Sequence, residues 1–262
     1  MESEPTTFAE WQVYFCVNRE SLLRIPWGSS HRLTKREKLT IMRSIQTFQP
    51  GESSEGRHFL KRARDYATRS GDHAYVDALK LFIAEEQRHA RDLGRFMRQE
   101  DIPLARNRPS DWIFRRLRQL AGLQTCVVVL LTAELYALLY YDALRAATRS
   151  PALRRLCTQI LRDEVRHIQF QSQTLGMLRR SFPQWLRSIC IGLQRVLFWG
   201  TCQVVWMGHH RVLRAGGFTL PEFSFEAGPL LEAALRMSGE PDRKMARQTA
   251  SQGVRAQLSI HS

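Results

Sequence analysis

Hydrophobic residues recur every three to four positions over long stretches of the chain, a period typical of amphipathic helices. Strand signals are nearly absent, because the sequence has no Asn-Gly hairpin turn and no sustained alternation of apolar and polar residues. The apolar stripes predict five long helical segments, at about 34–69, 73–98, 111–148, 151–180 and 184–214. A loop at 216–228 and a short helix at 229–237 are expected to follow, with an extra N-terminal helix at 7–23. The pattern therefore predicts an all-α protein.

The segments divide the chain into four parts. A partly helical N-terminal extension is expected over residues 1–35 and a four-helix bundle over residues 36–180. Residues 181–237 are expected to form helices packed on the bundle, and residues 238–262 are expected to form a polar, disordered tail.

Carboxylates and imidazoles interrupt the apolar stripes. Two segments each turn a Glu and a His, three residues apart, toward the core, and the pairs are Glu86 with His89 and Glu164 with His167. In the third segment Glu134 lies between two leucines of the stripe. In the first segment Glu52 and Glu55 lie between two phenylalanines, just after Pro50, which is expected to distort the helix there.

Converging buried carboxylates would repel one another, and an unpaired buried charge is costly. A cluster of cations removes both problems, and carboxylate plus imidazole ligands suit iron or manganese. One Glu-x-x-His pattern is weak because it arises by chance in many helices. Two copies on apolar stripes, with a lone Glu on each of two further helices, match the ligand set of ferritin-like di-iron and di-manganese bundles.

The motifs themselves carry a family resemblance. Glu85-Glu86-Gln87-Arg88-His89 and Asp163-Glu164-Val165-Arg166-His167 are similar to the acidic-Glu-x-Arg-His motifs of soluble acyl-carrier desaturases and bacterial multicomponent monooxygenases. Gly51-Glu52-Ser53 resembles the first-helix Gly-Glu-Ser of rubrerythrins, although no rubredoxin-like Cys pairs follow the bundle. Over about residues 36–180 the chain therefore resembles the ferritin-like di-iron carboxylate superfamily, a four-helix bundle that here has additional N- and C-terminal helices.

The resemblance implies a pair of metal ions, Fe/Fe or Mn/Fe, and no catalytic residue beyond the ligands. The implied ligands are Glu52, Glu86, His89, Glu134, Glu164 and His167. Glu55 is an alternative to Glu52 or an additional ligand.

A ligating histidine usually donates its second ring N–H to an acceptor, which fixes the orientation of the ring. Asp163 and Glu85 are the expected acceptors, each for the histidine of the opposite motif. Arg88 and Arg166 either neutralise these acids or lie at the surface. Tyr141, within two turns of Glu134, either lies near the metal ions or packs in the core.

Charge and cysteine usage bear on the cellular setting. The formal net charge of +14 favours acidic partners. The five cysteines form no C-x-x-C pair, which argues against a disulfide framework and for a reducing, cytoplasmic compartment. The N-terminus lacks the basic region of a secretory signal. The apolar run 126–141 is shorter than a spanning helix and contains Glu134, so no transmembrane helix is predicted.

The resemblance implies an O₂-using di-iron oxidase or oxygenase that acts on a small or acyl organic substrate, with an external electron donor. The substrate and the reaction type are left open. An acidic carrier protein and a second copy in a homodimer are candidate partners, and no nucleic acid is expected. The alternatives are an iron-handling or peroxide-protection protein, and a structural bundle whose acids pair with arginines. The Trp-rich segment after the bundle favours a substrate pocket over a storage cage.

Overall fold

The structure is a computed structural model, and it describes residues 4–52, 56–104 and 122–239. Within these ranges the chain is helical and contains no strand, as predicted. The helices are α1 (Phe8–Glu20), α2 (Lys35–Glu52), α3 (Arg57–Ser70), α4 (His73–Gln99), α6 (Leu123–Ala147), α7 (Pro151–Arg179), α8 (Gln184–Ala215) and α9 (Leu220–Met237).

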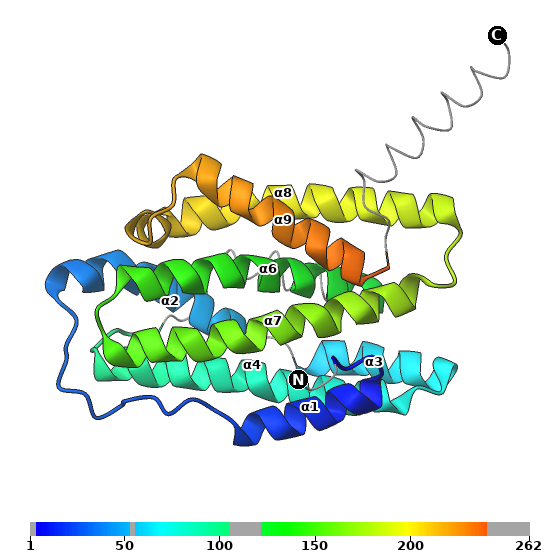
Figure 1. The fold of residues 1–262 in the computed structure, drawn as a ribbon, viewed down its shortest axis with the longest axis horizontal. Helices are drawn as coiled ribbons and strands as arrows, with labels where there is room; N and C mark the ends of the chain where they lie inside the picture. The colour runs from blue at the N-terminus through cyan, green and yellow to red at the C-terminus, as the bar shows by residue number, and fades with distance from the viewer. Residues whose placement is uncertain (1–3, 53–55, 105–121, 240–262) are drawn as a thin grey trace, which may run out of the picture.

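The helices are arranged in layers (Figure 1). Helices α6 and α7 pack against each other in the middle of the molecule, and α4 packs against α7 on one side. Helix α4 also contacts α1, α2 and α3. On the opposite side, α8 and α9 cover α6 and α7, and α8 also contacts α2. A continuous core of buried apolar residues runs through all these layers.

Helices α4 and α7 begin and end close to their predicted bounds. The start of α7 has the expected chemistry, because Ser150 accepts a hydrogen bond from the Leu153 amide and Pro151 occupies the first turn. The apolar stripes therefore predicted both helices correctly. The predicted helix start at Ser110-Asp111 lies outside the described residues, as does the tail from residue 240 onward.

Two sequence predictions of helix bounds are wrong. The single helix expected at 34–69 is two helices, since α2 ends at Glu52, two residues after Pro50, and α3 begins at Arg57. The loop expected at 216–228 is mostly helix, because α9 begins at Leu220. Its start is a capping box, in which Thr219 accepts from the Glu222 amide and the Glu222 carboxylate accepts from the Thr219 amide.

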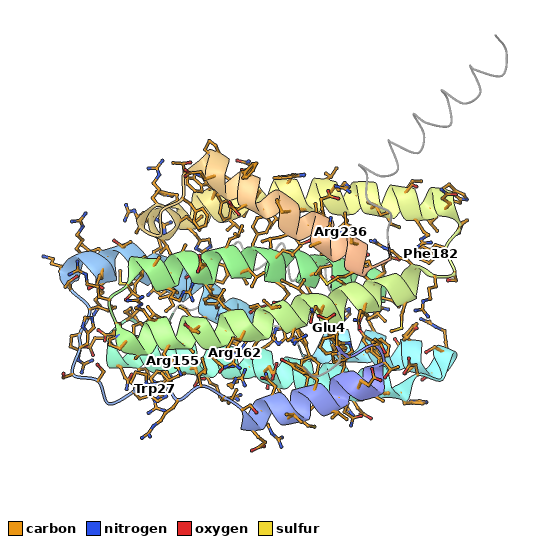
Figure 2. All side chains as sticks on the ribbon, in the orientation of Figure 1. Glu4, Trp27, Arg155, Arg162, Phe182 and Arg236 are labelled. Carbon is orange, nitrogen blue, oxygen red and sulfur yellow. The ribbon has the colours of Figure 1, made fainter. Side chains whose placement is uncertain are left out.

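Helix α1 and the segment between α1 and α2 both pack on the other helices. Trp11 is buried, and its ring N–H donates to Gln173 of α7 at 2.7 Å. Beyond α1 the chain runs along α4, where the guanidinium of Arg95 lies 4.4 Å from the centre of the Trp27 ring (Figure 2). The N-terminal extension is thus a packed cover of the bundle.

Two helices, α6 and α8, are long and apolar enough to cross a membrane when judged by length and composition alone. The apolar run 126–141, which by itself is shorter than a membrane-spanning helix, is part of the 25-residue helix α6. The most apolar stretch of α6 is 78% buried within the protein, as expected of a core helix. The corresponding stretch of α8 is only 22% buried.

Candidate metal centre

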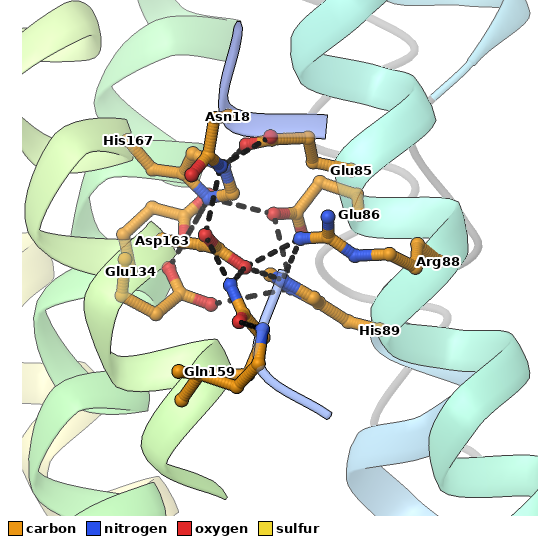
Figure 3. Close-up of polar contacts among 11 residues, drawn as sticks. Asn18, Glu85, Glu86, Arg88, His89, Glu134, Gln159, Asp163 and His167 are labelled. Carbon is orange, nitrogen blue, oxygen red and sulfur yellow. Dashed lines mark hydrogen bonds and ion pairs between the residues drawn. The ribbon is translucent and has the colours of Figure 1, made fainter. Parts of the chain in front are cut away.

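Four acidic and imidazole side chains meet between α4, α6 and α7 (Figure 3). Glu86 comes from α4, Glu134 from α6, and Glu164 and His167 from α7. All four side chains are buried, and one ligand atom from each lies within 4.8 Å of the others. A group of this composition and size could hold a metal ion.

His167 lies at the centre of the carboxylates. Its Nδ1 is 2.8 Å from a Glu86 oxygen, 3.5 Å from a Glu164 oxygen and 3.9 Å from a Glu134 oxygen. The Nδ1 atom therefore faces the cluster, and the opposite ring nitrogen points away from it.

His89 approaches the same cluster from α4. Its Nδ1 is 3.7 Å from a Glu86 oxygen and 3.8 Å from a Glu164 oxygen. Glu86 and Glu164 thus lie between the two histidines and near both, whereas Glu134 lies on the His167 side.

Carboxylates crowd together in this cluster. Within the part of the chain that the structure describes, both carboxylate oxygens of Glu164 are buried and lie 3.5 Å or more from the two histidine Nδ1 atoms. Burial, reinforced by the charge of Glu86, raises the pKa of Glu164. Burial alone would lower the pKa of His167, but the charge of Glu86 and hydrogen bonds to the surrounding carboxylates hold it well above its usual value. Both directions follow from the burial of several carboxylates beside His167, in a group that could hold a metal ion.

A second set of acids orients the two imidazoles. The Nε2 atom of His89 is 3.0 Å from Asp163 of the α7 motif. The Nε2 atom of His167 is 3.0 Å from Glu85 of the α4 motif. This is the crossed pairing that the sequence predicts, and it holds both Nδ1 atoms toward the cluster.

Donors from three helices surround the outer acids. Asp163 accepts from Arg88 at 2.5 Å and from Gln159 at 2.9 Å. Asn18 of α1 donates to Glu85 at 2.6 Å and to Asp163 at 3.0 Å, so it joins the two motifs. Burial alone would raise the pKa of Asp163, but His89 and Arg88 lower it well below its usual range.

The sequence reasoning missed two of these donors. Gln159 precedes Asp163 by one helical turn on the buried face of α7, and that spacing is a usable signal. Asn18 has no such signal, because its partners lie on helices far along the chain. Arg166, one of the two arginines considered as partners of the outer acids, instead donates to Gln169 and lies over the Tyr14 ring.

The remaining predicted site residues are placed as follows. Glu52 is the last residue of α2, but its side chain lies outside the described part of the structure, and so does Glu55. Tyr141 is buried on α6, with its ring 5.8 Å from that of Phe48 and 5.1 Å from that of Tyr140.

Aromatic side chains close the α1 side of the centre. The Phe82 ring lies 4.6 Å from the His167 ring, and the Phe15 ring of α1 lies 6.2 Å from it. Both phenylalanines are buried and also pack on Phe170. The imidazole is therefore shielded from water on this side, which strengthens its interactions with the carboxylates.

Comparison of the chain with models of known protein families, with curated proteins and with solved structures finds no match.

Proposed function

We propose that this protein is an O₂-dependent di-iron oxidoreductase with a ferritin-like four-helix bundle. The observation that carries the proposal is the buried group of Glu86, Glu134, Glu164 and His167, with His89 facing the same carboxylates. An oxygen-rich set with two imidazoles and no thiolate suits iron or manganese better than zinc. Among the described residues the Glu164 oxygens make only long contacts to the two histidines, which leaves both oxygens able to bind a cation.

Five described residues would hold the iron ions. They are Glu86, His89, Glu134, Glu164 and His167. The sequence also predicts Glu52 or Glu55 as a ligand, and both side chains lie outside the described part of the structure. When bound, the iron pair would supply the redox chemistry with O₂.

The surrounding residues would prepare the ligands for that role. Asp163 and Glu85 hold the imidazole rings in one tautomer, with Nδ1 available to a metal ion. Arg88 balances the charge of Asp163 outside the ligand set. Phe82 and Phe15 restrict the access of water to His167. The organic substrate and the electron donor would meet the centre from a different side, since α1 covers this one.

Iron content per chain, measured after anaerobic loading with Fe²⁺ and removal of loose metal, tests the proposal. About two irons per chain are expected, with a change in visible absorption and uptake of O₂ when the loaded protein meets air. Glu164→Ala is expected to abolish stoichiometric loading. His89→Ala and His167→Ala are each expected to lose one iron or most of the occupancy.

His209→Ala is the matched control. His209 is also a buried histidine, but its Nδ1 lies 2.6 Å from the Ser44 hydroxyl, outside the carboxylate cluster. Equal iron content in the three histidine variants would contradict the site assignment. A cage-sized assembly that mineralises many irons per chain would replace the oxidoreductase with an iron-storage protein.

A further inference from the structure

The outer face of α8 is apolar and exposed. Its exposed large side chains recur every three to five residues, and they are Trp185, Ile189, Leu193, Val196, Trp199, Val204 and Met207. Val196, near the middle, is 72% exposed. At 1.5 Å per residue, the face extends for about 33 Å. Soluble monomers rarely leave so long an apolar strip in water, so the face is a contact surface.

Charge is distributed unevenly along this helix. Helix α8 contains four arginines and no aspartate or glutamate. Arg195 pairs with Glu232 of α9, which leaves no unpaired charge on the stretch between Ser188 and His209. Arg211 and Arg214 are exposed near the C-terminal end. The apolar strip is thus followed directly by a cationic end.

A groove collects further cations at that end. It has a volume of about 750 Å³ and lies between the start of α2 and the end of α8. Its basic lining residues are Lys35, Arg36, His210, Arg211 and Arg214, and none of its lining residues is acidic. Glu37, in the first turn of α2, accepts hydrogen bonds from Thr34 and Arg149 and does not line the groove. The groove suits a phosphate-bearing group.

We propose that the outer face of α8 docks on an anionic membrane surface, with its apolar strip in the acyl boundary and the cationic groove on lipid phosphates. Lipid supplies both an apolar layer and negative charge, whereas a second copy of this chain would add the same cationic ends and the same net charge of +14. The inner face of α8 packs on α6, so the helix would lie along the membrane and not across it.

Flotation of the full chain with vesicles tests the docking. The chain is expected to float with vesicles of phosphatidylcholine and phosphatidylglycerol, and to bind pure phosphatidylcholine at least tenfold more weakly, since each cation near an anionic surface adds attraction. Val196→Glu is expected to weaken binding at least about tenfold, because it places a charge in the apolar layer. The pair Arg211→Gln and Arg214→Gln is expected to weaken binding about tenfold or more.

Matched controls separate this face from general surface effects. Val13 of α1 is 64% exposed, so Val13→Glu makes the same change on a different helix. Arg154→Gln with Arg155→Gln removes two exposed arginines from α7. Both controls are expected to float as the unchanged chain does.

Two results would overturn the proposal. The first is flotation of Val196→Glu equal to that of Val13→Glu. The second is a stable dimer in lipid-free solution that Val196→Glu splits while the unchanged chain fails to float, which would assign the face to contact between copies. Iron content is measured on the same samples, so a failure of docking is distinguishable from a failure of the metal centre.

Discussion

The centre of the molecule and the outer face of α8 depart from the usual distribution of side chains in opposite directions. Between α4, α6 and α7, carboxylates and histidines are buried. On α8, tryptophans and aliphatic side chains face outward. Each arrangement is unfavourable on its own, because charged groups lose hydration in the core and apolar groups order water at the surface. The contrast teaches where a partner would relieve each arrangement, since the buried group could hold a metal ion and the exposed strip is the surface that we propose docks on lipid.

The largest expected effect is a rise in melting temperature when metal binds the buried carboxylate and histidine group. Saturation with Fe²⁺ or Mn²⁺ under anaerobic conditions should raise the melting temperature, because the ion binds the folded state alone. At a thousand times its Kd the ion contributes about 4 kcal/mol, which is about 10 °C for a chain of this size. Thermal unfolding followed by circular dichroism, with and without metal, measures the shift.

Glu164→Gln serves as the control for that experiment. It should melt at a higher temperature than the metal-free unchanged chain, because it removes a charge from a cluster with excess negative charge. It should show no rise with metal. If metal raises the melting temperature of this variant as much as that of the unchanged chain, Glu164 is not part of the metal site.

The second effect concerns the acids behind the histidines. Asp163→Asn replaces the charged acceptor of His89 and should lower metal affinity about 10- to 100-fold, since loss of an outer partner costs that much at other metal sites. Competition with a chromophoric chelator measures the affinity. Asp77→Asn, which breaks only an exposed pair with Lys80, should leave it unchanged. Equal affinities in both variants would show that the crossed pairing has no influence on the metal.

The smallest expected effect is on the stability of the fold, and it compares a glycine on the outer side of α8 with a glycine packed at its C-terminal end. A Cβ on Gly216 would lie 2.5 Å from the Ala143 Cα, so Gly216→Ala should destabilise the fold by about 1–3 kcal/mol. A Cβ on Gly208 meets open space, so Gly208→Ala should stabilise the fold by about 0.5–1 kcal/mol. Chemical denaturation measures both. A loss of stability in Gly208→Ala would mean that the outer face is already covered.

The sequence predicted the parts of the fold that depend on long regular stripes. Helices α4 and α7 each have a long apolar face, and α7 also has the Ser150 cap, so their bounds could be read to within a few residues. The first half of α9 was taken for a loop because of its Gly and Pro residues, whereas the helix predicted at 229–237 is its second half. Thr219 and Glu222 form a capping box that signals its start. Pro50 indicated a distortion of the first predicted helix, and α2 ends two residues after it. A proline alone does not tell whether a helix bends or ends, so the separate helix α3 was not predicted.

The candidate site divides in the same way. Glu86 with His89, and Glu164 with His167, share a helix face by local geometry, so their convergence could be anticipated. The contribution of Asn18 depends on how α1 packs across two other helices, which no local pattern encodes. The exposure of α8 was also out of reach, because a helix that is apolar on most sides does not reveal which side the bundle covers.

The crossed hydrogen bonds have an evolutionary consequence. Each five-residue motif contributes a Glu and a His to the candidate site and an acid that contacts the histidine of the other motif. A change at Asp163 is felt first at His89, and a change at Glu85 is felt first at His167. Substitutions in one motif should therefore be accompanied by substitutions in the other among descendants of this gene, although the two motifs are far apart in the sequence.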